Sequence, residues 1–114
     1  MSNTIERFLR YIKIDTQSDE ASVTSPSTVK QHELASLLAA ELVEMGALDV
    51  IYDREHCYVY ASIPASEGYE EKKVLGFIAH MDTSPAVSGK DVKPNIIKNF
   101  DGKDIILNEA DNIV

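Results

Sequence analysis

The chain has 114 residues, of which 44% are hydrophobic, and this suffices for one modest globular domain. Its formal net charge of −8 and its scattered Lys and Arg residues argue against nucleic acid or an anionic membrane as the main partner, because a phosphate-binding face needs clustered cations. One cysteine cannot form an internal disulfide, and no apolar run approaches the ~20 residues that span a bilayer. We therefore expect a soluble, cytoplasmic protein, and the sequence carries no signal for or against a homo-oligomer.

The first predicted element is a short amphipathic helix over residues 4–13. Asn3 is placed to cap it, and its apolar residues recur at the spacing of one helix face that we expect to be buried, namely Ile5, Phe8, Leu9 and Ile12. Residues 15–27 are mostly small and polar and are predicted to form a loop. Its composition favours a plain surface connection between two helices over a segment beside a substrate cleft.

A second, longer helix is predicted between Thr28, which can cap its start, and Gly46, which can end it. His32 lies off the apolar stripe of this helix, so we expect a solvent-exposed histidine and not a metal ligand. The stripe that should face the core consists of Leu34, Leu38, Leu42 and Met45, with Ala35 and Ala39 beside it.

Two short strands follow, over residues 49–52 and 57–63, and the four polar residues between them predict a hairpin. Cys57 is most simply a small buried hydrophobe, and His56 in the connection has no second ligand near it, so we place it on the surface. Residues 64–73 are rich in charge and are predicted to be a solvated loop.

The stretch VLGFIAHMD, residues 74–82, is the one place where the sequence indicates chemistry. Its nearly unbroken apolar run predicts a strand covered on both faces, in the middle of a parallel or mixed sheet. His80 and Asp82 end this strand, and side chains two residues apart point the same way. Ligands gather at the carboxyl ends of such strands, so we expect one site there.

Beyond the central strand the sequence predicts a loop over residues 83–90 and two short strands over residues 95–100 and 104–107. The loop contains Ser-Gly-Lys but lacks the first glycine and the final Ser or Thr of a phosphate-binding loop. The late acidic residues have no calcium-loop spacing and are assigned to the surface: Asp91, Asp104, Glu109 and Asp111. No crossover helix follows the buried strand, although a parallel partner requires one, so we expect a fragment of a longer protein.

The pair His80 and Asp82 has two interpretations. A zinc-binding histidine commonly donates its second ring N–H to a carboxylate that fixes the ring, and an H-x-D step can provide both groups. The alternative is a structural hydrogen bond without metal. A catalytic zinc site normally has three protein ligands, and no HExxH or CxxC spacing supplies the others here.

The motif HMDTSP, preceded by GFIA and followed by SGKDVKPNII, resembles the corresponding segment of the peptidase T branch of the M20 metallopeptidase family. The likeness extends through ERFLRYIKIDTQS and PST upstream and NFDGKDIIL downstream, and so covers nearly the whole chain. It implies an α/β fold: residues 1–114 would be the N-terminal part of a zinc-peptidase catalytic domain. A mixed, mainly parallel central sheet would be flanked by helices, and the smaller inserted domain would be absent.

The resemblance also implies an activity and roles for two residues. The complete enzyme would be a two-zinc aminopeptidase that releases the N-terminal residue from tripeptides. His80 would ligate one zinc ion, and Asp82 would hydrogen-bond to the imidazole and orient it for catalysis. The remaining ligands and the general base would lie beyond residue 114, so the fragment alone is expected to be inactive.

Two further hypotheses stay open from the sequence. Other M20 relatives are dipeptidases, carboxypeptidases or deacylases, and a different substrate would keep the same zinc chemistry. A small binding module without catalysis would use His80 and Asp82 only as a structural pair. A longer reading frame with a further Asp, a Glu-Glu pair and a late histidine would favour an enzyme, because those residues complete a zinc site.

Overall fold

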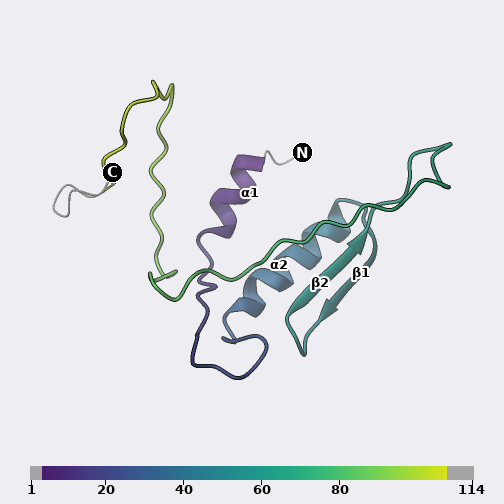
Figure 1. The fold of residues 1–114 in the computed structure, drawn as a ribbon, viewed down its shortest axis with the longest axis horizontal. Coiled ribbons are helices and arrows are strands. Elements are labelled where there is room, and N and C mark those ends of the chain that lie inside the picture. Colours follow the sequence, from purple (N-terminus) through teal and green to yellow (C-terminus); the bar gives the residue numbers. More distant parts are fainter. Residues whose placement is uncertain (1–3, 108–114) are drawn as a thin grey trace.

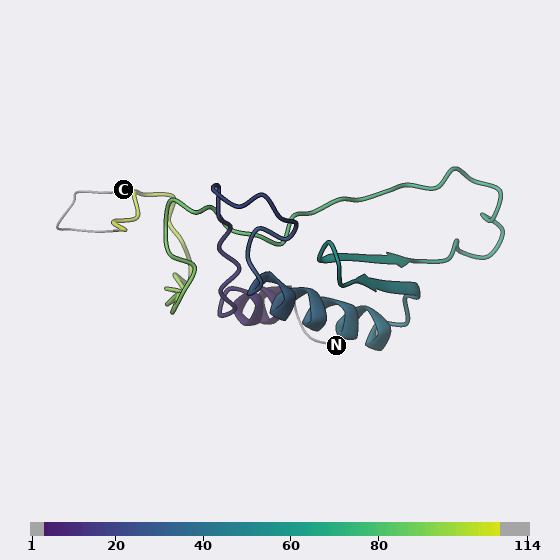
Figure 2. The same ribbon diagram turned by 90° about the horizontal axis from the view of Figure 1, so that it is seen from below.

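The computed structural model describes residues 4–107 and forms two helices and one antiparallel hairpin. The elements are α1 (Thr4–Tyr11), α2 (Gln31–Glu44), β1 (Leu48–Asp53) and β2 (Tyr58–Ser62), as Figure 1 shows. α2 runs along one side of the hairpin, and α1 lies beside α2 (Figure 2). Neither of these helices is long and apolar enough to cross a membrane.

The α/β composition agrees with the prediction, but the sheet does not. Within residues 4–107 the sheet has two strands, β1 and β2, and they are antiparallel. The parallel pairing in this part of the chain is an isolated bridge between Gln17 and Thr83. The expected mixed, mainly parallel central sheet is therefore not formed by the described residues.

α2 ends as the sequence predicts but begins differently. Gly46 adopts a φ of 80°, its N–H bonds to the Val43 carbonyl, and the Ala47 N–H bonds to the Leu42 carbonyl. This pattern closes a helix where glycine avoids the strain of a left-handed conformation. The predicted Thr28 cap is wrong: Lys30 occupies the N-cap without a side-chain cap bond, and the Thr28 hydroxyl donates instead to the Gln17 carbonyl, at 2.8 Å.

The small core lies between α2 and the hairpin. Its buried apolar residues are Leu34, Ala35 and Cys57, which confirms the predicted stripe in part and the buried cysteine fully. His32 is half-buried, and its Nδ1 lies 2.6 Å from the Tyr52 hydroxyl of β1. The predicted solvent exposure of His32 is therefore only partial, because the β1 strand supplies a tyrosine opposite the start of α2.

Polar side chains connect α1 to α2. Ile5 and Phe8 are exposed, so their predicted burial is wrong, whereas Leu9 and Ile12 of the same face are half-buried. The predicted cap at Asn3 lies outside the described residues. The buried carboxylate of Glu41 on α2 accepts hydrogen bonds from Arg10 and Tyr11. Arg7 adds a third contact to Glu41, at 3.6 Å.

Arg7, Arg10 and Tyr11 favour the negatively charged form of Glu41. Burial by itself raises the pKa of Glu41, but hydrogen bonds from Tyr11 and Arg10 and the positive charges of both arginines outweigh it, and the pKa lies below its usual value. Burial, together with the hydrogen bond to Glu41, raises the pKa of Tyr11. A charged Glu41 therefore joins the two helices.

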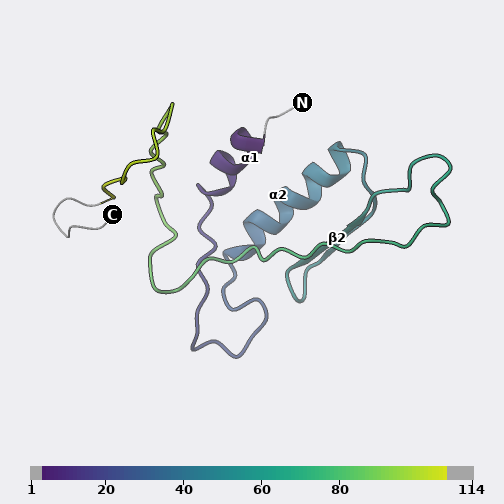
Figure 3. The ribbon, with the colours of Figure 1, turned by 45° about the horizontal axis from the view of Figure 1, so that its top comes forward.

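Residues 63–107 contain neither helix nor strand, and this overturns the predicted central strand. After the solvated loop of residues 63–73, the chain runs back past the hairpin and α2 toward residues 15–18 (Figures 1 and 3). Phe77 and Ile78 are fully exposed in this segment, and no hydrogen bond joins residues 74–79 to the rest of the described chain. The apolar run finds no neighbouring strand among residues 4–107.

The two strands predicted over residues 95–100 and 104–107 are also not formed. Gly102, at a φ of 81°, marks the bend expected between them, but both flanking segments stay unpaired. Asp91 and Asp104 are exposed as predicted, whereas Glu109 and Asp111 lie outside the described residues.

Candidate functional site

His80 and Asp82 lie side by side at the end of the unpaired apolar segment. His80 Nδ1 is 3.2 Å from Asp82 Oδ1 and 2.8 Å from the Asp82 main-chain oxygen. The side chain of His80 is 84% exposed and that of Asp82 is 43% exposed. The structure thus brings together the two predicted site residues and leaves the imidazole accessible, while their roles in metal binding and catalysis stay predictions.

The hydrogen bonds of His80 determine which ring nitrogen can bind a ligand. Both neighbours of Nδ1 are oxygen acceptors, so Nδ1 must carry the proton. In the neutral ring Nε2 then presents a free lone pair to solvent. A metal-ligating histidine has this arrangement, with a carboxylate on the opposite nitrogen, and the pair therefore fits the zinc that the resemblance implies.

One imidazole does not make a zinc site. Across residues 4–107 there is no group of three or more His, Cys, Asp or Glu side chains that could hold a metal ion. His32 pairs with Tyr52, and His56 pairs with Asp53 at 2.8 Å in the hairpin turn, which agrees with its predicted surface position. The described residues therefore contribute one candidate ligand and its orienting carboxylate.

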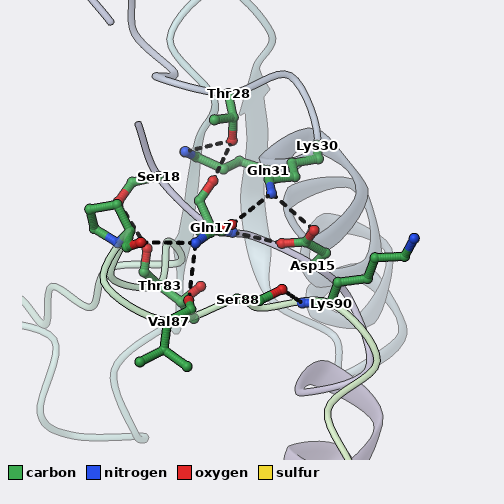
Figure 4. Close-up of polar contacts among 11 residues, drawn as sticks. Asp15, Gln17, Ser18, Thr28, Lys30, Gln31, Thr83, Val87, Ser88 and Lys90 are labelled. Atoms are coloured by element: carbon green, nitrogen blue, oxygen red, sulfur yellow. Dashed lines mark hydrogen bonds and ion pairs between the residues drawn. The ribbon is translucent and has the colours of Figure 1, made fainter. Parts of the chain in front are cut away.

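The loop after Asp82 is attached to the loop between the two helices, and we call residues 15–18 and 83–89 together the loop junction (Figure 4). The Thr83 N–H donates to the Thr16 carbonyl at 3.1 Å, and the Ser18 N–H donates to the Thr83 carbonyl at 2.9 Å. The Gln17 side-chain amide donates to the carbonyls of Pro85 and Val87, at 3.0 and 3.1 Å. Thr16 is buried in this contact.

The loop junction is in turn attached to the start of α2. Lys30 Nζ lies 2.9 Å from Asp15 Oδ2, and the Lys30 hydrogen bond, together with the Gln17 N–H, holds the pKa of Asp15 below its usual value. Gly89 approaches so closely that a Cβ atom there would lie 2.9 Å from Asp15 Oδ1. Residues 15–27 are therefore more than the plain surface connection that composition favoured.

Gln17 and Thr83 are the residues of this region that reasoning from composition missed. They belong to the motifs DTQS and HMDTSP, which carried the family resemblance. Their appearance in those two motifs was the available signal, but nothing in their spacing indicated that they touch.

An apolar cavity of about 670 Å³ lies between the helices, β2 and residues 77–81. Its polar lining residues Arg7, Tyr11 and Glu41 already bond to each other, and neither His80 nor Asp82 lines it. The remaining lining is almost entirely apolar and comes from Leu38, Leu42, Met45, Tyr58, Val59, Tyr60, Phe77, Ile78, Ala79 and Met81. The His80 and Asp82 pair therefore does not line the cavity, although Ala79 and Met81 on either side of His80 do.

Comparison with known proteins confirms the resemblance read from the motifs. The whole chain is 50% identical to peptidase T of Alkaliphilus oremlandii and 53% identical to peptidase T of Desulfitobacterium hafniense. Peptidase T of Clostridium acetobutylicum is likewise 53% identical over the whole chain. The chain spans 27–28% of the length of these relatives, and no family model matches it.

Proposed function

We propose that this chain is the N-terminal part of a cytoplasmic aminopeptidase of the M20 family, which uses two zinc ions and removes the N-terminal residue from tripeptides. The similarity of the whole chain to proteins named peptidase T supports this proposal. Residues 1–114 are then one portion of the catalytic domain. The remainder of that domain and a smaller inserted domain belong to the longer polypeptide.

The observation that carries the proposal is the hydrogen-bonded pair of His80 and Asp82 with Nε2 open to solvent. In the proposed enzyme His80 Nε2 holds one zinc ion, and Asp82 keeps the proton on Nδ1 and fixes the ring plane. A bound zinc ion would lower the pKa of its water toward neutrality and would itself polarise the scissile carbonyl of the peptide. Asp82 is thus a positioning carboxylate and not the base that removes the proton from water.

The exposed apolar surfaces of this chain separately support the proposal that it is part of a longer polypeptide. Residues 74–79 are apolar yet exposed, and the cavity beside them is lined mainly by hydrocarbon. Burying such surfaces is favourable by about 25 cal/mol per Å² of apolar area. We propose that the longer polypeptide, which in the relatives is more than three times this length, covers both surfaces.

The test is to express the complete reading frame, assay tripeptide cleavage with and without a chelator, and count bound zinc. His80→Ala should remove about one zinc equivalent and abolish most turnover. Asp82→Asn should retain much of the zinc but reduce affinity or activity by ~10 to 100-fold, the usual effect of disturbing a ligand's own hydrogen-bond partner. Unchanged zinc content in His80→Ala would contradict the ligand assignment.

The hairpin turn offers a matched control, because His56 and Asp53 form the same kind of pair at 2.8 Å. His56→Ala and Asp53→Asn should leave zinc content and turnover unchanged. Equal losses at both pairs would mean that the effect is not specific to His80 and Asp82. Cleavage of dipeptides or acylated amino acids with tripeptides left intact would indicate another M20 activity. Absence of both cleavage and bound zinc would indicate a non-catalytic module with a structural His80 and Asp82 pair.

A further inference from the structure

We propose that Gln17 is a positioning residue for His80 and Asp82 and acts through the loop junction. The inference rests on the proposed function. It adds to that function a residue, Gln17, which lies more than sixty positions before Pro85 in the sequence and donates to its carbonyl. It follows from how the segment carrying His80 is attached to the rest of the molecule.

The segment that carries His80 and Asp82 is hydrogen-bonded to the rest of the described chain only on its C-terminal side. Residues 74–79, which precede His80, make no hydrogen bond to the rest of the described chain. Thr83, which follows Asp82 directly, has both its N–H and its carbonyl bonded to the backbone of residues 16–18. Within residues 4–107, the loop junction therefore determines where Asp82, and with it the His80 ring, is held relative to the helices.

Gln17 is central to the loop junction because each of its polar groups has a partner (Figure 4). Its N–H donates to Asp15 and its carbonyl accepts from Thr28. Its side-chain oxygen faces Lys30 Nζ at 3.4 Å, and its side-chain nitrogen donates to the carbonyls of Pro85 and Val87. The residue thus connects the start of α2 to the loop behind Asp82.

The chemistry of those contacts requires a glutamine. One nitrogen with two N–H groups meets two carbonyl oxygens, and a carboxylate of the same shape has no proton to donate. Gln17→Glu would place a negative charge against two carbonyl dipoles while keeping the contact with Lys30. The substitution therefore removes the connection to residues 85–87 and leaves the attachment to α2 in place.

The test uses the complete polypeptide. Gln17→Glu should make zinc leave about 10-fold faster in the presence of a chelator and lower kcat by about 10-fold, at the mild end of effects on ligand orientation. KM should change little, because the side chain of Gln17 is already bonded to the carbonyls of Pro85 and Val87 and faces Lys30. The ring nitrogen signals of His80, observed by NMR on the metal-free protein, should shift toward those of an unbonded imidazole.

Gly89→Ala provides a second variant that leaves Gln17 intact. Its methyl group would displace Asp15 Oδ1 and press on Thr83 Oγ1, which lies 3.1 Å from the same position. We expect zinc release and kcat to change in the same directions as in Gln17→Glu, but by smaller factors. Ser18→Ala should change them least, since the Ser18 N–H keeps its own bond to Thr83.

A control separates positioning from general stability. Arg10→Ala weakens the contact with Glu41, which includes no residue of the loop junction, and should lower the melting temperature without changing zinc release or the His80 signals. If Arg10→Ala reproduced the effects of Gln17→Glu, or if Gln17→Glu behaved as wild type, the inference would be overturned while the proposed function stood. A wild-type polypeptide without zinc or peptidase activity would overturn both.

Discussion

Among the described residues, buried apolar side chains occur in residues 4–62 and not in residues 63–107. Leu34 is 8% exposed and Ala35 is fully buried, whereas Leu75 is 80% exposed and Phe77 is 93% exposed. The first region finds its partners within itself, as α2 packs on the hairpin that follows it. The second finds none within the described chain. An apolar run therefore indicates a need for burial but does not say which part of a polypeptide will provide it.

The largest expected effect comes from making the same substitution in each region. In this chain Leu34→Ala should cost about 2–5 kcal/mol of unfolding free energy, because it leaves a cavity in the core. Leu75→Ala should stay within about 0.5 kcal/mol, since the side chain is exposed. Urea unfolding followed by circular dichroism measures both.

Repeating the Leu75→Ala measurement in the complete polypeptide sharpens the comparison. There we expect a cost similar to that of Leu34→Ala, because the added chain covers residues 74–79. An equal cost already in the 114-residue chain would contradict the exposed position of Leu75. No added cost in the complete polypeptide would contradict the proposed covering.

A second, smaller contrast concerns ion pairs. Glu41→Ala removes the acceptor shared by Arg10 and Tyr11 and should cost about 1–3 kcal/mol, the usual effect of leaving partly buried donors unsatisfied. The control is Asp101→Asn, which removes the ion pair between Asp101 and Lys103 in residues 63–107. These two residues are near neighbours in the sequence, and both are exposed. That change should leave the melting temperature unaltered, and a loss comparable to that of Glu41→Ala would show that residues 101–103 are more ordered than their exposure indicates.

The smallest expected effect is a pH dependence of the junction that connects the two regions. Lys30 and the Gln17 N–H depress the pKa of Asp15. The ion pair of Asp15 with Lys30 therefore stabilises the junction fully above pH ~3.9, the ordinary pKa of an aspartate, and this stabilisation is lost as the pH falls through the depressed pKa. Below about pH 4, the amide protons of Ser18 and Thr83 should exchange faster relative to those of α2. Lys30→Met should move this onset to higher pH, and an unchanged onset would contradict the assigned cause.

Local patterns predicted the packed region well. The 3.6-residue period located α2, and Gly46 marked its end because the left-handed turn there favours a residue without a Cβ. The polar connection between two β-rich runs located the hairpin, and Cys57 proved to be buried. Each of these features depends on neighbours close in sequence.

Several of the failures involve distant partners. Residues 74–82 have the composition of a central strand, but no strand of the described chain lies beside them. The predicted burial of Ile5 and Phe8 failed because α1 contacts α2 through charges that a hydrophobic pattern does not weigh. His80 and Asp82 were predicted to lie together since they are two residues apart, whereas the contact of Gln17 with the loop at residues 85–87 spans too much sequence for any spacing rule.

The exposed run at residues 74–79 has one more consequence. It is β-rich, uncharged and free of proline, the composition of segments that stack into cross-β fibrils, and both strands of the hairpin beside it have an open edge. Copies of the chain at high concentration should therefore precipitate through this run even while their helices stay intact. A lysine in place of Ile78 would act as a gatekeeper, so that the purified chain stays in solution at concentrations where the natural sequence precipitates.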